Sequence, residues 1–437
     1  MTWFTRRFLY LLGGIALLLA CAPGLSLFVP FAAACAAALA VATIVDASLG
    51  PRRRDLSIVR LLPDHFALRR TAELQYEVTN RSQRALAVGL VESPVRTLRY
   101  PEDEIVAPVG PSSVATVVRA AIPVARGEDT FGAIFAWYEN PLGLLRRRVR
   151  IDAPQSFRVF PDLSAVERYG ALHVRNRLIE AGLRKMRLRG AGTEFESLRE
   201  FSPGDPFRSI DWKATARRGK VMVSQYEVER SQNVMLVLDC GRLMTPRVGA
   251  QRKFDYAVTA ALSLATIAGL ADDRVGVVAF AQRILAASAP RSTRSSIAKL
   301  TEQLYDLEPK FEEANYARAF AYLRAHLHKR SLVVFLTDVI DPVSQAMLYA
   351  ELGSLARRHL VVCVFMNDAA VAAALSAPPH DLRSAYRASA ALDLLDERKT
   401  AAAILTRAGV LVVDVPAAKL TTSLIDEYLR VKQRGLL

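Results

Sequence analysis

The first part of the chain is apolar, and positions 8 to 45 carry no charged side chain. As one α-helix this run would be about 57 Å long, well beyond the ~30 Å hydrocarbon core of a bilayer. Pro23-Gly24 and Pro30 lie near its middle, where the chain needs to reverse. The pattern therefore predicts an anchor over residues 1–54, in which two membrane-spanning helices at about 6–24 and 27–47 are joined by a very tight turn.

Arginines flank the apolar run on both sides, with Arg6 and Arg7 before it and Arg52 to Arg54 after it. Because Lys and Arg are enriched in cytoplasmic flanks, we expect both termini and the bulk of the chain to lie in the cytoplasm. A cleaved signal peptide ending near Ala20-Cys21-Ala22 competes with this interpretation, as does a lipoprotein signal at Cys21. The apolar run continues past both sites, which favours the helical hairpin.

Short alternating runs follow over residues 55–162. Residues 72–78 alternate with period two, and residues 114–124 and 132–137 indicate further strands. Turn signals such as Gly110-Pro111 and Asn140-Pro141 separate these runs. The pattern predicts a small antiparallel β-sandwich of immunoglobulin-like architecture.

The last part of the chain, residues 232–437, alternates between apolar runs and stretches of helical spacing. Apolar on both faces, the runs are typical of buried parallel strands, so we predict a mainly parallel, doubly wound α/β sheet. The predicted strands are 233–239, 274–280, 331–338, 360–366 and 410–415. The predicted helices are 252–270, 294–306, 315–328, 343–358, 382–408 and 417–433.

Carboxylates stand at the ends of three of these strands. Asp239 and Asp338 each end a strand, and Asn367-Asp368 follows a third. Ligands of such sheets bind beyond the carboxyl ends of the strands, so these side chains mark the expected site. Carboxylate oxygens suit a hard cation such as Mg²⁺.

Residues 163–231, between the two folded regions, are rich in charge and are predicted to form a linker that packs on the α/β domain. From Arg175 to Lys220 there are 12 Lys or Arg and 6 Asp or Glu, with aromatic residues between them. Three interpretations compete: a nucleic-acid surface, an acid/base site using Glu194, Asp205 or Asp211, and a structural clasp or partner surface. In the clasp, the carboxylates would neutralise the Arg side chains and the aromatic side chains would be buried. The carboxylates would repel a phosphate backbone, which favours the third. The candidate residues are Glu194, Phe195, Arg199, Asp205, Arg208, Asp211, Trp212, Lys213 and Arg217.

Composition narrows the function classes. The 437 residues are 51% hydrophobic, which excludes wholesale disorder, and four Cys with no CxxC pair argue against a disulfide scaffold or a zinc knuckle. No GxxxxGK[ST] phosphate loop and no GxSxG elbow is present, so we expect neither ATP hydrolysis nor a serine hydrolase of that type. The formal charge of +15 beside a membrane favours attraction to anionic lipid.

The charged stretch carries motifs that resemble a known bacterial family. They are Gly192-Thr193-Glu194-Phe195, Pro203-Gly204-Asp205, and the run from Arg208 to Arg217 containing Ile210-Asp211-Trp212-Lys213. Together with the apolar N-terminus and the sheet beginning at Asp239, they resemble the membrane-anchored "domain of unknown function 58" family. That resemblance implies a von Willebrand factor A-like C-terminal domain, a MoxR-type AAA+ ATPase as partner, and the bacterial inner membrane as location.

The chain departs from the pattern that the resemblance implies. The Gly-Asp-Asp of the family is here Gly204-Asp205-Pro206, and the metal motif Asp-x-Ser-x-Ser is here Asp239-Cys240-Gly241-Arg242-Leu243. Two oxygen ligands are thereby lost, so any Mg²⁺ at Asp239 and Asp338 would bind weakly through waters. We predict that the Arg242 guanidinium replaces the metal between the two carboxylates. An empty site with Arg242 in solvent, and true metal binding, are the alternatives.

These observations lead us to expect a non-enzymatic, membrane-anchored adaptor that binds another protein, needs no cofactor and does not bind nucleic acid. Assembly or remodelling of envelope complexes with a MoxR-type ATPase is the role that the resemblance implies. Two alternatives stay open: a hydrolase that uses the acidic residues of the 192–217 motif, and a binder of anionic lipid or nucleic acid.

Overall fold

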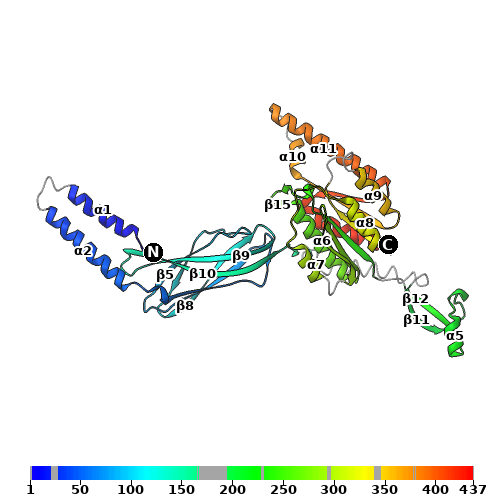
Figure 1. The fold of residues 1–437 in the computed structure, drawn as a ribbon, viewed down its shortest axis with the longest axis horizontal. Coiled ribbons are helices and arrows are strands. Elements are labelled where there is room, and N and C mark those ends of the chain that lie inside the picture. Colours follow the sequence, from blue (N-terminus) through cyan, green and yellow to red (C-terminus); the bar gives the residue numbers. More distant parts are fainter. Residues whose placement is uncertain are drawn as a thin grey trace. The chain divides into compact units, whose positions relative to one another are not determined.

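The computed structural model describes residues 2–20, 28–164, 166, 194–227, 231–292, 297–338, 346–376, 378 and 380–436. The chain divides into two compact units, Met1–Phe160 and Pro161–Leu437. The first contains two apolar helices and two mainly antiparallel sheets, and the second contains a small hairpin module and an α/β domain (Figure 1).

Two apolar helices, α1 (Arg6–Ala20) and α2 (Phe28–Leu49), pack against each other in the first unit (Figure 1). Within the described residues, one helix is long and apolar enough to cross a membrane, and it covers Val29–Leu49. The described part of α1 has 15 residues, about 22 Å at ~1.5 Å per residue, which is short of a bilayer core. The predicted first span, 6–24, extends beyond the described residues, so the prediction of two spanning helices stays a prediction. The tight turn predicted between them lies outside the described residues.

Two sheets enclose one apolar core in the rest of this unit, which is the arrangement of a β-sandwich. One sheet has the order β1-β10-β9-β5-β7, with β3 pairing β10, and the other has the order β2-β4-β8-β6. The strands are β1 (Thr2–Phe4), β2 (Leu56–Leu61), β3 (Phe66–Ala67), β4 (Ala72–Asn80), β5 (Leu86–Glu92), β6 (Leu98–Arg99), β7 (Ile105–Val109), β8 (Ser113–Pro123), β9 (Gly127–Glu139) and β10 (Leu145–Phe160). A 3-10 turn, η2 (Arg53–Asp55), leads from α2 into β2.

A buried ion pair crosses the sandwich core. Arg60 on β2 donates two hydrogen bonds of 2.8 Å to the carboxylate of Glu92 on β5, and the hydroxyl of Tyr76 donates a third of the same length. The Arg60 guanidinium also lies 4.4 Å from the ring centroid of Phe131. The carboxylate and the guanidinium therefore satisfy each other in a place that water does not reach.

The carboxylate of Asp46, in the last turn of α2, joins the helices to the sandwich. It is fully buried and accepts hydrogen bonds from the backbone N–H groups of Leu142 (2.8 Å), Leu144 (3.1 Å) and Leu145 (3.0 Å), in the β9–β10 turn. The start of α1 is fixed at the same turn, because the Thr5 N–H donates to the Leu144 carbonyl at 3.0 Å. Both helices thus leave the sandwich from one place.

The second unit begins with a hairpin module, residues 194–227. Strands β11 (Glu194–Glu200) and β12 (Met222–Glu227) pair antiparallel, and the 3-10 turn η3 (Phe207–Ser209) and helix α5 (Trp212–Arg218) lie between them. The sequence predicted a linker here, and the described part has its own secondary structure (Figure 1). Whether it packs on the α/β domain stays a prediction.

The α/β domain is built on a six-stranded sheet of order β17-β16-β13-β18-β19-β20, in which β17 is antiparallel and the others are parallel. The predicted alternation of strands and helices is present; the edge strand β17 and the helix α10 were not foreseen. The strands are β13 (Asn233–Asp239), β16 (Arg274–Phe280), β17 (Ile284–Ser292), β18 (Leu332–Leu336), β19 (Leu360–Asn367) and β20 (Leu411–Pro416), with a small hairpin of β14 (Arg247–Val248) and β15 (Gln251–Arg252).

Helices cover both faces of this sheet (Figure 1). One core contains residues of α6, α7 and α12 and the other contains residues of α8, α9 and α11, because alternate side chains of each strand point to opposite faces. The helices are α6 (Lys253–Leu270), α7 (Ile297–Leu304), α8 (Tyr316–His326), α9 (Ala346–Ala356), α10 (Ala369–Ser376), α11 (Leu382–Arg407) and α12 (Leu420–Arg434), with 3-10 turns η4 (Arg242–Met244) and η6 (Ala417–Lys419).

Replacing Asp46 by Ala should loosen the junction between α2 and the sandwich. Three buried N–H groups would lose a charged acceptor, which we expect to lower the free energy of unfolding by about 2–4 kcal/mol. Thermal unfolding of the detergent-solubilised full chain measures the change. Asp152→Ala is the matched control, because Asp152 is exposed and its ion pair with Arg150 lies at the surface. Equal melting temperatures for the two variants would contradict a structural role for Asp46.

Candidate functional site

The carboxyl edge of the α/β sheet holds the two predicted aspartates. Asp239 ends β13, and Thr337-Asp338 directly follow the neighbouring strand β18, so the parallel register brings them to one edge. Both side chains are buried. The two expected aspartates thus follow neighbouring strands at one edge of the sheet.

Three donors surround the Asp239 carboxylate. The hydroxyl groups of Thr337 and Tyr316 donate to Oδ2 at 2.7 and 3.0 Å, and the Gly241 N–H donates to Oδ1 at 2.7 Å. Burial raises the pKa of Asp239, although these hydrogen bonds act in the opposite direction. Burial and the neighbouring Asp239 carboxylate also raise the pKa of Tyr316. The group is therefore held by hydroxyl and amide donors in a site that disfavours its charged form.

Asp338 is neutralised by two cations from distant parts of the chain. The ammonium of Lys253, the first residue of α6, forms an ion pair with Oδ2, and the Arg398 guanidinium of α11 pairs with Oδ1 at 2.8 Å. Arg398 also pairs with Asp414 on β20 at 2.8 Å. Burial lowers the pKa of Arg398, but the two carboxylates outweigh this effect and raise it. A connected series of alternating charges, Lys253, Asp338, Arg398 and Asp414, therefore runs through this edge.

Arg242 lies elsewhere. It begins η4, its side chain is 55% exposed, and its guanidinium pairs with Glu313 at 2.8 Å. The prediction placed Arg242 between the two carboxylates because it is close to Asp239 in sequence. The structure instead brings Lys253 and Arg398 to Asp338. Lys253 could have been suspected from its place at the start of a predicted helix, whereas no local signal marks Arg398.

The arrangement of the described side chains at this edge does not favour a metal ion. Among the described residues, no group of three or more His, Cys, Asp or Glu side chains is arranged to hold one. A Cβ added at Gly241 would lie 3.0 Å from both the Ala314 Cβ and Asp239 Oδ1, so a serine there would have to displace its neighbours. Lys253 and Arg398 already occupy the surroundings of Asp338.

In the hairpin module, the carboxylates of the second candidate site organise the backbone. Asp205 accepts a hydrogen bond of 2.7 Å from Arg199 and one of 2.9 Å from the Ser202 N–H. Asp211 caps α5 by accepting from the Lys213 and Ala214 N–H groups at 3.0 and 2.9 Å.

These contacts set the ionisation of the two acids. The hydrogen bond from Arg199 lowers the pKa of Asp205, and the Ala214 N–H lowers that of Asp211. Both shifts favour the ionised form of the acids, which suits a structural role.

The remaining predicted residues of this motif divide into two groups. Glu194 and Phe195 lie on β11, and their side chains are outside the described part of the structure. The other four are exposed on η3 and α5, and they are Arg208, Trp212, Lys213 and Arg217. The structure thus separates the acids that hold the module together from side chains that are available for contact.

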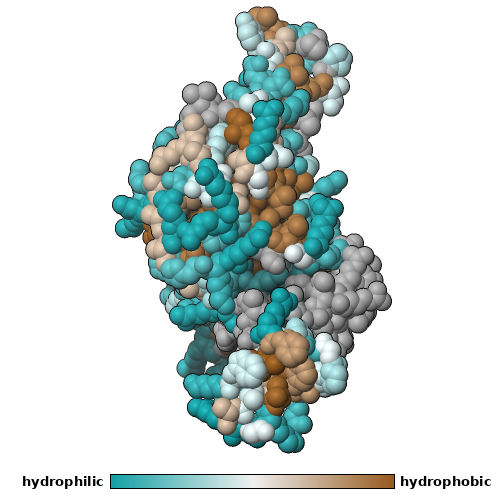
Figure 2. Space-filling view, turned by 90° about the vertical axis from the view of Figure 1, so that its right-hand side faces the viewer, coloured by the Kyte–Doolittle hydropathy of each residue, from teal (hydrophilic) through white to brown (hydrophobic). Residues whose placement is uncertain are grey.

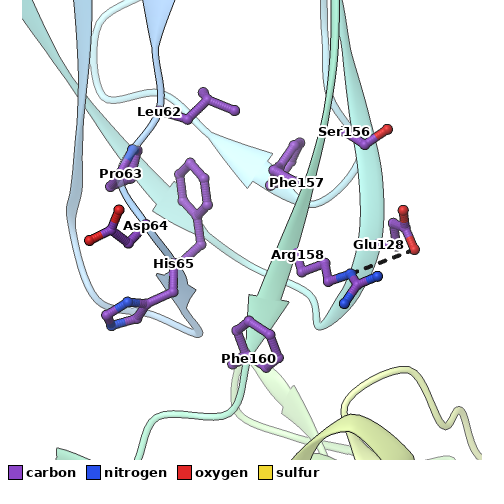
Figure 3. A pocket seen from close by; sticks show the side chains of 10 residues that line it. Leu62, Pro63, Asp64, His65, Glu128, Ser156, Phe157, Arg158 and Phe160 are labelled. Atoms are coloured by element: carbon purple, nitrogen blue, oxygen red, sulfur yellow. Dashed lines mark ion pairs between the residues drawn. The ribbon is translucent and has the colours of Figure 1, made fainter.

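A shallow pocket lies at one end of the β-sandwich, with a volume of about 480 Å³ (Figure 3). Phe66 and Phe157 belong to the core beneath it, and Arg158 and Glu128 approach each other to 3.9 Å at its rim. His65 and Asp64 come from the β2–β3 loop. The mixed lining offers no constellation that matches a reaction, so the sheet edge and the hairpin module remain the candidate sites.

Replacing Asp338 by Asn should destabilise the α/β domain strongly. Lys253 and Arg398 would be left in a nearly buried position without their shared anion, which costs about 3–5 kcal/mol in comparable sites. Asp239→Asn is the control, since the hydroxyls of Thr337 and Tyr316 can accept from an amide, and we expect a loss below about 1 kcal/mol. Chemical denaturation of the full chain, followed by circular dichroism, gives both values. Similar losses for the two variants would contradict this assignment.

The stability of Asp239→Asn relative to the wild type should depend on pH. The pKa of Asp239 is raised on folding from about 3.9 in the unfolded chain, so the native state binds the proton more tightly. Its contribution to stability is therefore present below pH ~4 and is lost as the pH rises through the native pKa. Asp239→Asn lacks this titration, so its stability relative to the wild type should increase from pH 4 to pH 7.

Solved structures give only distant similarity. A FixG-related protein from Vibrio parahaemolyticus matches with a TM-score of 0.18 and 13% identity, covering 24% of this chain and 96% of that one. The CARDB domain of the PF1109 protein from Pyrococcus furiosus matches with a TM-score of 0.17 and 14% identity, covering 25% and 94%. At such scores the fold description rests on the present structure alone.

Sequence relatives match shorter stretches. The protein Rv1480 of Mycobacterium tuberculosis, named as uncharacterized, is 24% identical over 181 residues, which are 41% of this chain and 56% of that one. The uncharacterized protein YeaD of Bacillus subtilis is 44% identical over 43 residues, 10% of this chain and 11% of that one. The chain thus spans about half, or less, of the length of these relatives. Residues 197–375, from the hairpin module to α10, match the family described as "Protein of unknown function DUF58", and this is the family that the motifs of the charged stretch predicted.

Proposed function

We propose that the protein is a membrane-anchored adaptor that binds another protein through its α/β domain. In this proposal α1 and α2 form a hairpin in the bacterial inner membrane, the β-sandwich stands at its cytoplasmic base, and the α/β domain is von Willebrand factor A-like. The partner is a MoxR-type AAA+ ATPase acting on envelope complexes, as the family resemblance implies.

The observation that carries the membrane part is the shared base of the two helices. Asp46 at the end of α2 and Thr5 at the start of α1 both bind the β9–β10 turn. Helices that are held together at these ends run antiparallel, and a hairpin in a bilayer has both of its ends on one side. The exposed apolar side chains of both helices need an apolar solvent, and the flanking arginines favour the cytoplasmic side.

The α/β part rests on topology and on the sheet edge. The strand order corresponds to 3-2-1-4-5-6 in order of sequence, which is a doubly wound arrangement, and Asp239 ends the first strand. Internal ion pairs fill the edge at Asp338, which supports a contact surface in place of a metal or small-molecule site.

One aromatic side chain stands out on this edge. Phe311 is 89% exposed. Its loop is bonded to the segment after β13, because the Lys310 N–H donates to the Cys240 carbonyl at 2.7 Å and the Arg242 N–H donates to the Glu312 carbonyl at 2.8 Å. An aromatic side chain on a well-held loop is a typical anchor of protein interfaces.

Reporter fusions test the hairpin. Green fluorescent protein, which fluoresces after folding in the cytoplasm, is fused in separate strains to Met1 and to Leu437. A hairpin predicts fluorescence from both fusions, with the chain in the membrane fraction. A single span by α2 would leave one of the two fusions dark and would contradict this part of the proposal.

A binding measurement tests the sheet edge. The detergent-solubilised full chain is titrated with the purified MoxR-type ATPase of the same organism, and Phe311→Glu is compared with Leu382→Glu. Both side chains are exposed and apolar, but Leu382 begins α11 and is not on the 310–312 loop. We expect Phe311→Glu to weaken binding about 30-fold, roughly 2 kcal/mol, and Leu382→Glu to leave it unchanged. No binding by the wild type, or equal losses, would contradict the proposal.

A further inference from the structure

The hairpin module exposes two large aromatic side chains. Phe207, on η3, is 78% exposed, and Trp212, at the start of α5, is 69% exposed. Figure 2 views the molecule from the side of this module, and in its lower part brown apolar atoms lie among teal polar ones. Phe201 stacks beside Phe207 with 5.8 Å between ring centroids, which adds to the apolar surface.

Positive charge surrounds these aromatics. The acids whose side chains are described in the module each have a partner: Glu200 pairs with Lys220 at 2.8 Å, Asp205 with Arg199, and Asp211 with the N-terminal amides of α5. Four exposed cations form no ion pair among the described residues, and they are Arg208, Lys213, Arg217 and Arg218. The module therefore presents unpaired cations beside exposed aromatic rings.

This combination has a recognisable chemistry. Trp and Phe favour the boundary between headgroups and acyl chains, and Lys and Arg are attracted to anionic headgroups. The same chain contains the helix Val29–Leu49, which is apolar enough to cross a membrane. Under the proposed anchoring the chain is held at a bilayer, which supplies an anionic surface. An acidic protein would match the cations equally well, but nothing in the described residues points to one.

We propose that the exposed surface of η3 and α5, which carries Phe207, Arg208, Trp212, Lys213, Arg217 and Arg218, lies against an anionic bilayer. The aromatic rings enter the headgroup region and the four cations bind lipid phosphates. This inference rests on the membrane anchoring proposed above. It adds a second, peripheral membrane contact by a part of the chain that is distant in sequence from the helices.

Fluorescence quenching tests the contact directly. The protein has three Trp, so Trp3→Phe with Trp137→Phe leaves Trp212 as the single reporter in the full chain. This protein is reconstituted in vesicles of phosphatidylcholine, with or without 30% phosphatidylglycerol, whose acyl chains carry bromine as a quencher. We expect at least twofold stronger quenching with phosphatidylglycerol. About 0.5 M salt should abolish the difference by screening.

Charge reversals supply the matched comparison. Arg217→Glu with Arg218→Glu should remove the quenching that depends on phosphatidylglycerol. Arg383→Glu with Arg387→Glu changes the net charge equally on the exposed side of α11 and should preserve it. Equal losses from both pairs would overturn the assignment to this face, because overall charge would then explain the effect.

The remaining outcomes separate this inference from the proposed anchor. A chain that does not enter the vesicles at all would contradict the anchor. A chain that enters them while Trp212 stays unquenched in both lipids overturns the inference alone. Quenching that is equal in the two lipids overturns the anionic specificity. A Trp212 emission shift that needs an added protein, without quenching by bromine, would identify the face as a protein interface and also overturn the inference.

Discussion

A buried carboxylate that needs counterions determines how the α/β domain is assembled. Asp338 lies at the end of a central strand, where an ionised group without partners would be strongly unfavourable. Its two cations come from the start of α6 and from α11, so both helices have to take fixed positions for the charge to be satisfied. Because Arg398 also binds Asp414, the same interaction fixes the edge strand β20. The ends of several elements thus depend on a single acid.

The sequence predicted what periodicity and strand polarity control. Strands apolar on both faces indicated the parallel sheet, and the ends of neighbouring strands were expected to bring Asp239 to the edge where Asp338 also lies. The counterions of Asp338 could not be predicted from the sequence. Arg398 follows Asp338 by 60 residues and lies on a helix whose sequence gives no sign of a buried ion pair. Arg242 was chosen for its nearness in sequence, and its actual partner Glu313 comes from a loop that no local pattern positions.

The same distinction applies to the rest of the chain. Absence of charge predicted both apolar helices. Asp46 directly follows the uncharged run, and no local signal marks its role, which comes from a turn almost 100 residues later. The charged motif was assigned a structural role on its alternating signs, and the contacts of Asp205 and Asp211 agree with that role. The expected burial of its aromatic side chains is wrong for Phe207 and Trp212, which are exposed. Its secondary structure could not be foreseen from interleaved charges, since these carry no clear period.

The family match covers residues 197–375 and therefore includes only some of the charged residues of the sheet edge. It includes Asp239, Lys253 and Asp338, so the first ion pair of the edge lies in the part of the chain that resembles the family. Arg398 and Asp414 lie beyond it, as do the sandwich and both apolar helices. Asp338 therefore pairs with one residue inside the matched stretch, Lys253, and with one beyond it, Arg398.

Strand β10 has a mechanical consequence. It extends from Leu145, beside the Asp46 carboxylate, to Phe160, where the first unit ends, and its pairing with β9 shifts register between Asp152 and Gln155. A load applied beyond Phe160 would travel along this strand and pull it lengthwise against β9, so that many hydrogen bonds resist together. Traction on the C-terminal half would thus reach the base of the two helices without first peeling the sandwich apart.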